Sequence, residues 1–376
     1  MRLAPKNLLL ALITLHLPLI GNALTISYTD LTPVGGYRLA TPYGTSDSMQ
    51  AGYGYTSQGG LHAMAWSGTA SSFVDLNPSG ARSSVAYGVS GNQQVGSAAF
   101  DGVNSRAGIW YGTAASFVNL NPAGAIVSEA FATSGNQQVG QVYLNGVWRA
   151  GRWSGTAASF VDLHPAVAIS SAAYATSGST QAGQVYYGVQ YYNNGSLRID
   201  HAALWSGTAA SFVDLHPAGA LTSKASAISG DRQGGEVYFG SGIGLHAALW
   251  SGTAESFVDL NPAVAISSRI YGMSGDAQVG LAFLAAGGGL PDRVHAGLWF
   301  GTAESFIDLH TALGSDFVDS IAYGVWTDGS TIKVVGEAQR NGLHQPTLWT
   351  ITGVPEPSSM ALLCGYIIAA ACFRKR

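Results

Sequence analysis

The sequence predicts an all-β protein, a seven-bladed β-propeller, and three observations lead to this fold class. A block centred on Leu-Trp-Ser-Gly-Thr-Ala recurs along the chain, with its tryptophans 43–52 residues apart. Each interval holds four short β-prone runs separated by turn residues, which is typical of a propeller blade. The N-terminal segment also matches a piece that the last repeat lacks. The seven repeated tryptophans are Trp66, Trp110, Trp153, Trp205, Trp250, Trp299 and Trp349.

The second repeat illustrates the predicted strands, which cover residues 85–90, 94–100, 107–111 and 116–120. The first two are joined by a turn within a Ser-Gly-x-x-Gln-x-Gly series that most repeats share. Glycine suits this turn because it adopts a positive φ without steric cost. Four strands per repeat therefore predict one antiparallel sheet per blade.

The last repeat predicts how the ring closes. It ends at Trp349 without the outer Ser-Phe-Val-Asp-Leu strand, whereas residues 25–33 match that strand in pattern and register. We expect this N-terminal strand to complete the seventh blade. Closure of this kind leaves only short, protected sheet edges.

The composition favours an exported β protein. Only 10% of the 376 residues are charged, against about 25% in an ordinary soluble domain. The 12 basic and 20 acidic residues between positions 24 and 353 make this body mildly acidic, so it lacks the basic footprint of a nucleic-acid-binding protein. Both cysteines, Cys364 and Cys372, lie near the C-terminus, and the repeats therefore offer no disulfide framework. We exclude nucleic acid as a partner and expect no cofactor or metal.

The N-terminal 23 residues carry the pattern of a secretory signal peptide. Two basic residues precede an apolar run at 8–20, and small residues follow it. A membrane anchor is the alternative, but a span needs about 20 apolar residues and this run also holds His16 and Pro18. The propeller is therefore expected to occupy residues 24–353.

The C-terminal segment, residues 354–376, combines a Pro-rich motif, an apolar run at 358–373 and a basic tail. The run is short for a transmembrane helix and needs local thinning of the bilayer. Terminal basic residues favour the cytoplasmic side, which leaves the body on the export side. The motif and the tail consist of Val354, Pro355, Glu356, Pro357, Arg374, Lys375 and Arg376.

This tail resembles the PEP-CTERM sorting signal of Gram-negative bacteria. The resemblance implies recognition by an exosortase in the inner membrane, transient anchoring there, and delivery to the cell surface or extracellular matrix, often alongside exopolysaccharide production. An ordinary tail anchor after a Pro-rich linker is the alternative. The repeats in turn resemble the extracellular HAF-type repeat family at His62-Ala63, His201-Ala202, His246-Ala247 and His295-Ala296. Arg106, Arg149 and His344 depart from that pattern, and the family implies no molecular function for this chain.

Two repeated rows of polar residues invite a catalytic or metal-binding interpretation. One is the histidine row above; the other contains six aspartates and one asparagine. Identical residues at identical places in each repeat are better explained by the repeat itself, with each Asp capping its own turn. No catalytic residue is predicted. The second row is Asp30, Asp75, Asn119, Asp162, Asp214, Asp259 and Asp308.

The repeats differ mainly between the second and third strands and between blades, and both connections emerge on the same face of an up-and-down blade. From the last glycine of the Ser-Gly series to the next Trp, the fourth repeat spans 22 residues where others span as few as 13. Rigid aromatics beside amides and a carboxylate suit sugar or protein recognition, although a solvated hairpin is the alternative. The candidate ligand residues are Tyr186, Tyr187, Tyr191, Tyr192, Asn193, Asn194 and Asp200.

Three charged residues, Glu129, Lys224 and Arg269, start equivalent inner strands and are expected to rim the channel on that face. Most other inner-strand positions are Ser, Ala, Thr and Gly. The sequence therefore favours a non-catalytic adhesion or matrix module that binds exopolysaccharide, another glycan or surface proteins. An exported propeller enzyme acting on polysaccharide and a purely structural surface protein are the alternatives.

Overall fold

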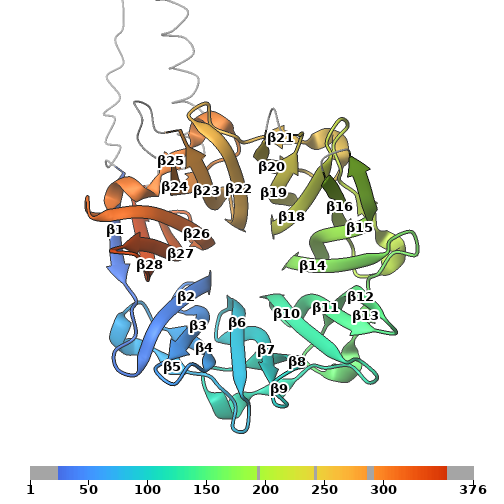
Figure 1. Cartoon of the computed structure of the whole chain (residues 1–376), viewed down its shortest axis with the longest axis horizontal. Coiled ribbons are helices and arrows are strands. Elements are labelled where there is room, and N and C mark those ends of the chain that lie inside the picture. The colour runs from blue at the N-terminus through green and yellow to red at the C-terminus, as the bar shows by residue number, and fades with distance from the viewer. Residues whose placement is uncertain (1–23, 193–194, 241–243, 286–291, 354–376) are drawn as a thin grey trace, which may run out of the picture.

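Each repeat forms one sheet of four antiparallel strands in the computed structural model, and seven such sheets stand around a central axis (Figure 1). The structure describes residues 24–192, 195–240, 244–285 and 292–353. It confirms the all-β, seven-bladed propeller with four-stranded blades. The predicted signal peptide and the C-terminal sorting segment, 1–23 and 354–376, lie outside the described residues.

The first two strands of each blade lie nearest the channel (Figure 1). The innermost strands are β2 Tyr37–Thr45, β6 Ser83–Ser90, β10 Val127–Ser134, β14 Ser170–Ser177, β18 Thr222–Ser229, β22 Ala265–Ser274 and β26 Phe317–Thr327. The second strands are β3 Gln50–Thr56, β7 Gln93–Ala99, β11 Gln137–Leu144, β15 Thr180–Tyr192, β19 Arg232–Tyr238, β23 Ala277–Leu284 and β27 Thr331–Arg340.

The third and outer strands complete each sheet. The third strands, each carrying a repeated Trp, are β4 Leu61–Trp66, β8 Ser105–Trp110, β12 Val147–Trp153, β16 Gly195–Trp205, β20 Leu245–Trp250, β24 Arg293–Trp299 and β28 Leu343–Thr352. The outer strands are β5 Val74–Asp75, β9 Val118–Asn119, β13 Val161–Asp162, β17 Val213–Asp214, β21 Val258–Asp259, β25 Ile307–Asp308 and β1 Thr25–Asp30.

Six outer strands are shorter than the sequence predicts. The strand expected at 116–120 is only β9, because a 3₁₀ turn precedes it. The Ser116 hydroxyl accepts the Tyr111 N–H at 2.8 Å and donates to the Thr113 carbonyl at 2.6 Å. Local hydrogen bonds of this kind compete with strand pairing. The 3₁₀ helices are η1 Ala70–Ser72, η2 Ala114–Ser116, η3 Ala157–Ser159, η4 Ala209–Ser211, η5 Ala254–Ser256, η7 Ala303–Ser305 and η8 Leu309–Ala312.

The N-terminal strand closes the ring as the sequence predicts. β1 pairs antiparallel with β28, from Thr25 opposite Thr352 to Asp30 opposite Thr347. The blade therefore contains strands from both ends of the propeller, in the order β1-β28-β27-β26. The Trp66 indole N–H in the first blade donates to the Leu31 carbonyl at 3.0 Å, which ties this strand to the next blade as well.

A buried serine bridges neighbouring blades at every junction except this seam. Ser84 is an example: its hydroxyl accepts the Ala63 N–H of the preceding blade at 2.9 Å and donates to Asn77 at 2.7 Å. At the seam the equivalent positions are Ala40 and Pro346, which have no hydroxyl and no N–H respectively. Donor and acceptor are thus lost together, and no buried polar group is left unpaired there. The bridging serines are Ser84, Ser128, Ser171, Ser223, Ser268 and Ser320.

The hydrophobic core lies between blades rather than within them. One cluster, for example, joins Ala51, Ala63 and Leu76 of the first blade to Ala86 and Trp110 of the second. Seven such clusters occupy the seven junctions of the described residues. All seven repeated tryptophans are fully buried. No blade can therefore bury its apolar surface without its neighbours, as the repeat predicts.

The Gln and the Gly of the repeated Gln-x-Gly motif each have a structural role in the blade. The side-chain amide oxygen of the buried Gln138 accepts the Gly155 N–H at 2.8 Å and fixes the turn after the third strand. The glycine two residues later, Gly140, lies under a bulge of the inner strand, where a Cβ would stand 1.8 Å from the Glu129 carbonyl oxygen. The motif therefore encodes a tight approach of two strands rather than a ligand site.

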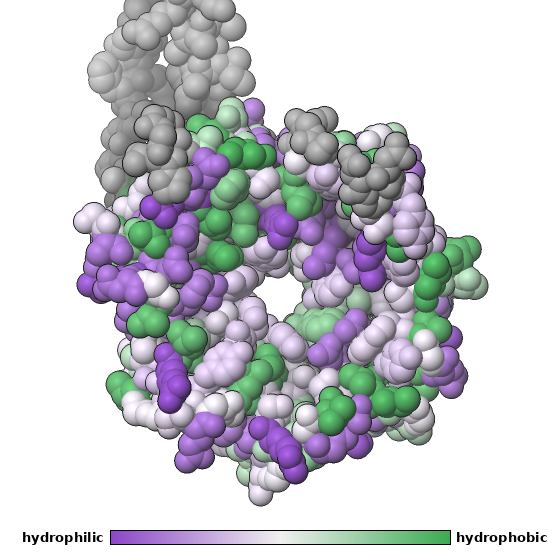
Figure 2. All heavy atoms as spheres, in the orientation of Figure 1, coloured by the Kyte–Doolittle hydropathy of each residue, from purple (hydrophilic) through white to green (hydrophobic). Residues whose placement is uncertain are grey.

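The antiparallel blades give the disc two different faces. The turn face carries the Ser-Gly turns between first and second strands, at glycines 91, 135, 178, 230 and 275. The loop face carries the second-to-third connections and the entries to the innermost strands, including the long β15–β16 hairpin. Between the two faces, a central channel opens through the disc (Figure 2).

Candidate functional site

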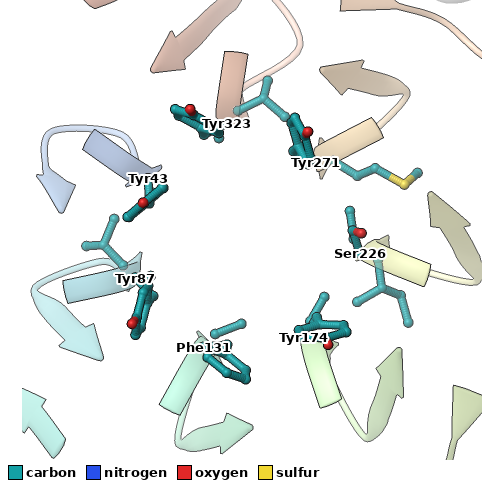
Figure 3. Close-up of a pocket in the computed structure, with 18 of the residues that line it drawn as sticks. Tyr43, Tyr87, Phe131, Tyr174, Ser226, Tyr271 and Tyr323 are labelled. Atoms are coloured by element: carbon teal, nitrogen blue, oxygen red, sulfur yellow. The ribbon is translucent and has the colours of Figure 1, made fainter. Parts of the chain in front are cut away.

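An aromatic ring surrounds the channel (Figure 3). Each innermost strand places one residue at the same level, and six of the seven are aromatic. Neighbouring rings are in contact, with centroids 5.2 Å apart for Tyr43 and Tyr323 and 5.4 Å apart for Tyr87 and Phe131. Tilted and edge-to-face arrangements of this kind are favourable for aromatic pairs. The seven residues are Tyr43, Tyr87, Phe131, Tyr174, Ser226, Tyr271 and Tyr323.

The ring is continuous except at one place. Contacts run from Tyr174 through four further rings to Tyr271. Ser226 alone interrupts the circle, between Tyr174 and Tyr271. On the turn-face side, a cavity of about 200 Å³ is lined by the ring and by small or aliphatic residues. The channel therefore narrows at an aromatic collar with a single gap.

On the loop-face side of the collar, the channel mouth is polar. The Tyr323 hydroxyl donates to Glu337 Oε1 at 3.0 Å, and Thr41 donates to the other oxygen at 3.3 Å. Burial and the neighbouring Glu337 raise the pKa of Tyr323 above its ordinary value. Tyr323 is therefore neutral at physiological pH and holds the carboxylate in place.

The three predicted rim residues lie on innermost strands at this mouth. Glu129 accepts a hydrogen bond from Gln141 Nε2 at 2.7 Å. Arg269 forms an ion pair with Glu236 at 3.0 Å, and the Lys224 ammonium lies 4.3 Å from the centre of the Tyr174 ring. Since the equivalent positions in other blades include Val85 and Ile321, the charge pattern of the mouth is specific to individual blades.

A cavity of about 380 Å³ opens on the loop face at the junction of the third and fourth blades. Its size falls in the range of about 300–1,000 Å³ typical of small-molecule sites. Three aromatic rings and two amides line it together with a guanidinium. The residues that carry these groups are Trp148, Tyr174, Tyr186, Gln141, Gln184 and Arg198.

The fourth-blade hairpin places the predicted ligand residues in different surroundings. Tyr186 lines the cavity, and the Arg198 guanidinium lies 4.1 Å above its ring. Asp200, the cross-strand neighbour of Tyr186, holds that guanidinium through contacts of 2.7 and 2.9 Å. Tyr186 and Asp200 are thus brought together at one site.

Two other predicted residues of the hairpin, Tyr187 and Tyr191, do not line this cavity. Tyr187 lies edge-on to His201 at 4.7 Å and packs on the core between the third and fourth blades. Tyr191 is 80% exposed on the projecting part of the hairpin. Tyr192 belongs to β15, but its side chain is not among those described, and Asn193 and Asn194 lie outside the described residues.

In four of the seven blades, a histidine of one repeated row pairs with the aspartate of the other row in the same blade. Oδ1 of Asp214 accepts the His216 N–H at 2.9 Å, which is the predicted cap of the turn. Oδ2 of the same carboxylate binds His201 Nδ1 at 2.8 Å. Equivalent pairs occur in three further blades, and Arg149 takes the histidine position opposite Asp162. Both rows therefore stabilise the blade, and the thirteen-residue spacing from each His to its Asp is the sequence signal that could have joined them.

Sequence reasoning missed two features of this site. The expectation that the inner strands present mainly small residues is wrong at the collar, although an aromatic recurs four residues before the glycine of most Ser-Gly turns. Trp148 was also missed, because it stands outside the register of the seven repeated tryptophans. Its place beside Tyr174 depends on the neighbouring blade, which a single repeat does not reveal.

The described residues contain no group of three or more His, Cys, Asp or Glu side chains arranged to hold a metal ion. No helix within the same residues is long and apolar enough to span a membrane. The predicted C-terminal span falls beyond the last described residue.

Comparison with known proteins supports the fold. No protein-family model and no curated protein sequence matches the chain. The β-propeller domain of the Trilobed protease from Pyrococcus furiosus, described as having an open velcro topology, is similar in structure, with a TM-score of 0.53 and 8% identity over 86% of this chain and 98% of that one. In this protein β1 closes the ring. At this identity, the likeness shows the propeller fold alone.

Two enzymes have more distant similarity. A puromycin-hydrolyzing peptidase of Mycobacterium tuberculosis gives a TM-score of 0.49 at 12% identity, over 85% of this chain and 56% of the peptidase. A Trypanosoma rangeli sialidase gives a TM-score of 0.38 at 10% identity, over 86% of this chain and 56% of the sialidase. Much of each enzyme therefore has no counterpart in this chain.

Proposed function

We propose that the protein is an exported, non-catalytic propeller that binds a surface or matrix glycan at the loop face. The cavity between the third and fourth blades carries the proposal, because it combines Trp148 and Tyr186 with Gln141 and Gln184. Flat aromatic faces pack against the C–H surface of a sugar ring, and amides hydrogen-bond to its hydroxyls. Tyr and Trp provide this contact area at low conformational cost.

The arrangement of the cavity favours binding of a chain rather than of a single small molecule. Tyr174 belongs both to the cavity and to the collar, so the two sites share one wall. Arg198 is held by Asp200 and stacked on Tyr186, which fixes its direction before any ligand arrives. A preorganised donor loses little freedom on binding. A glycan with several units can thus contact the side cavity and the mouth together.

Glycan binding by the full chain in mild detergent tests this function. Trp148→Ala and Tyr186→Ala are each expected to weaken binding at least about tenfold, because each removes an aromatic anchor. Trp326→Ala is the matched control: Trp326 is the other tryptophan outside the repeated series, lies at the turn-face end of β26, and is likewise half-buried. Its replacement should leave binding unchanged.

Three outcomes contradict the proposal. The first is that an array of bacterial and plant glycans shows no binding. The second is equal loss in all three variants, which indicates an effect on folding. The third is cleavage of a bound oligosaccharide, detected by chromatography after prolonged incubation, which makes the protein an enzyme instead of a binding module.

The cellular location of the protein is a second part of the proposal, and the two terminal signals of the sequence support it. We infer removal of residues 1–23 and sorting through the motif at 354–357 by an exosortase-type enzyme in the inner membrane. N-terminal sequencing of the surface-extracted protein should begin at Leu24. Replacing Pro355 and Pro357 by Ala should retain the chain in the inner-membrane fraction, whereas unchanged surface delivery contradicts this route.

A further inference from the structure

One innermost strand carries both a charged residue of the mouth and the gap in the aromatic collar. Strand β18 carries Lys224 at the mouth and, two residues later, Ser226 at the only gap of the aromatic ring. In the third blade the same positions hold Glu129 and Phe131. The fifth blade therefore opens the collar and places a cation above the opening.

The Lys224 ammonium has an unusual environment for a lysine. It lies over the face of Tyr174 at 4.3 Å, where the ring attracts a cation. Glu236 is opposite Lys224 in the strand pairing, but that carboxylate makes its ion pair with Arg269 of the next blade at 3.0 Å. Among the described residues Lys224 makes no ion pair within 4.0 Å. Burial lowers its pKa, so this ammonium gains from an anion that reaches it.

Around the fifth-blade gap the nearest charges pair off and leave one cation over, while the other carboxylates of the mouth, Glu129 and Glu337, belong to the third and seventh blades. Arg198 is compensated by Asp200, and Arg269 is compensated by Glu236. Lys224 remains, on a body that carries 20 acidic and 12 basic residues between positions 24 and 353. A local cation on an acidic protein selects an anionic group that is brought close by other contacts.

We infer that the fifth-blade gap is a subsite for a sugar carboxylate, so that the glycan bound at the loop face is an acidic, uronate-containing polysaccharide. Lys224 receives the carboxylate, Ser226 leaves room for the sugar ring between Tyr174 and Tyr271, and the neighbouring aromatic cavity binds the adjoining units. This inference rests on the proposed glycan binding and names its ligand class.

Calorimetric titration of the full chain with a hexamer of galacturonate and with a neutral glucose hexamer tests this subsite. Lys224→Met is expected to weaken binding of the acidic hexamer about tenfold or more, since a charge-assisted hydrogen bond is lost. Binding of the neutral hexamer should stay unchanged. Lys333→Met is the matched control: Lys333 lies 5.4 Å from the centre of the Trp326 ring, but at the turn face.

A second variant keeps the test independent of the lysine. Ser226→Tyr completes the collar with the residue that five other blades already use, so the fold should accept it. It should close the gap and weaken binding of the acidic hexamer by a similar factor. Thermal melting of each variant shows whether the propeller remains intact.

The outcomes separate the two proposals. Equal binding of both hexamers, or acidic binding that neither variant changes, overturns the carboxylate subsite and leaves glycan binding in place. Loss of both ligands in Trp148→Ala together with selective loss of the acidic ligand in Lys224→Met supports both. No binding of either hexamer, with no effect of Trp148→Ala on any glycan, overturns the proposed function itself. If poly-glutamate binds as tightly as the acidic hexamer and its binding also depends on Lys224, the ligand is an acidic protein segment, and the proposal of a uronate-containing polysaccharide is wrong.

Discussion

The third strand and the innermost strand of each blade differ in how closely their residues repeat around the ring. Around the third strand, the buried Trp, the Gln-to-turn hydrogen bond and the serine bridge recur from blade to blade. On the innermost strand, equivalent mouth positions hold Glu129, Lys224 or Arg269 in three blades and uncharged residues in the others. Both belong to one repeat and one sheet. The residues that recur in each blade therefore hold the ring together, whereas the residues that differ at the mouth are not needed for the stability of the fold.

The largest expected effect lies in the constant part. Gly140→Ala places a Cβ 1.8 Å from the Glu129 carbonyl oxygen, in backbone that has no free space. We expect a loss of at least about 3 kcal/mol in the free energy of unfolding, measured by urea denaturation. Gly314→Ala is the control, because its Cβ would meet only the end of the Asp316 side chain. Equal stability of the two variants would contradict the claim that the close approach at the bulge requires glycine.

The seam offers a test of the serine bridge. Pro346→Ala should expose an unpaired buried N–H and destabilise the propeller by about 1–3 kcal/mol. Ala40→Ser should also destabilise the chain, because its hydroxyl finds no N–H at Pro346. The double variant should recover much of the loss by forming the bridge that Ser84 makes elsewhere. Strict additivity in urea denaturation contradicts this coupling.

One position holds histidine or asparagine in six of the seven blades, and its histidines predict a pH effect. His216 contacts Ser223 and the Ala220 carbonyl at 2.8 and 3.1 Å, as Asn121 contacts the equivalent groups of its own blade. Burial and the stacked His201 lower the pKa of His216 below its ordinary 6.5, and His310 behaves likewise beside His295. The unfolded chain therefore binds protons first, and stability should fall as pH drops below about 6.5, whereas between about 6.5 and 7.5 these two histidines should have little effect.

The double variant His216→Asn and His310→Asn should make stability less dependent on pH between 7.5 and 5.5, in urea denaturation at each pH. Its stability at pH 7.5 should stay close to that of the parent chain, because Asn makes the same hydrogen bonds in three other blades. An unchanged pH dependence excludes these two residues as its source.

The smallest effect on stability is expected at the mouth. Glu129→Val introduces the residue that the second blade has at the same position, Val85. The change removes one part-buried hydrogen bond, which Gln141 donates to Glu129. Thermal denaturation should show a change within about 1 kcal/mol. A loss as large as that of Gly140→Ala would mean that mouth positions maintain the ring after all.

Much of the fold was predictable because the same sequence pattern recurs in each repeat and each repeat forms one blade. The tryptophan spacing predicted seven blades, and the unmatched strand at residues 25–33 predicted the closure that β1 and β28 make. The outer strands were overestimated, since the hydrogen bonds of Ser116 form a 3₁₀ turn that strand patterns do not reveal.

The site was less predictable because it forms between repeats. The hairpin of the fourth blade was identified from its length, and Tyr186 and Asp200 do meet there. Side chains alternate along a strand, however, so only one of Tyr186 and Tyr187 can face the cavity. Trp148 comes from the preceding blade, and the collar needs one residue from each of seven blades. Such assemblies are invisible within any single repeat.

Hydroxyl-radical footprinting of the full chain with saturating oligouronate tests the central claim most directly, because it locates the ligand on one of the two faces. The account predicts protection of Trp148 and Tyr186 on the loop face and no change at Tyr111, an exposed tyrosine of the turn face. Protection of Tyr111 with unchanged labelling of Trp148 and Tyr186 would contradict it.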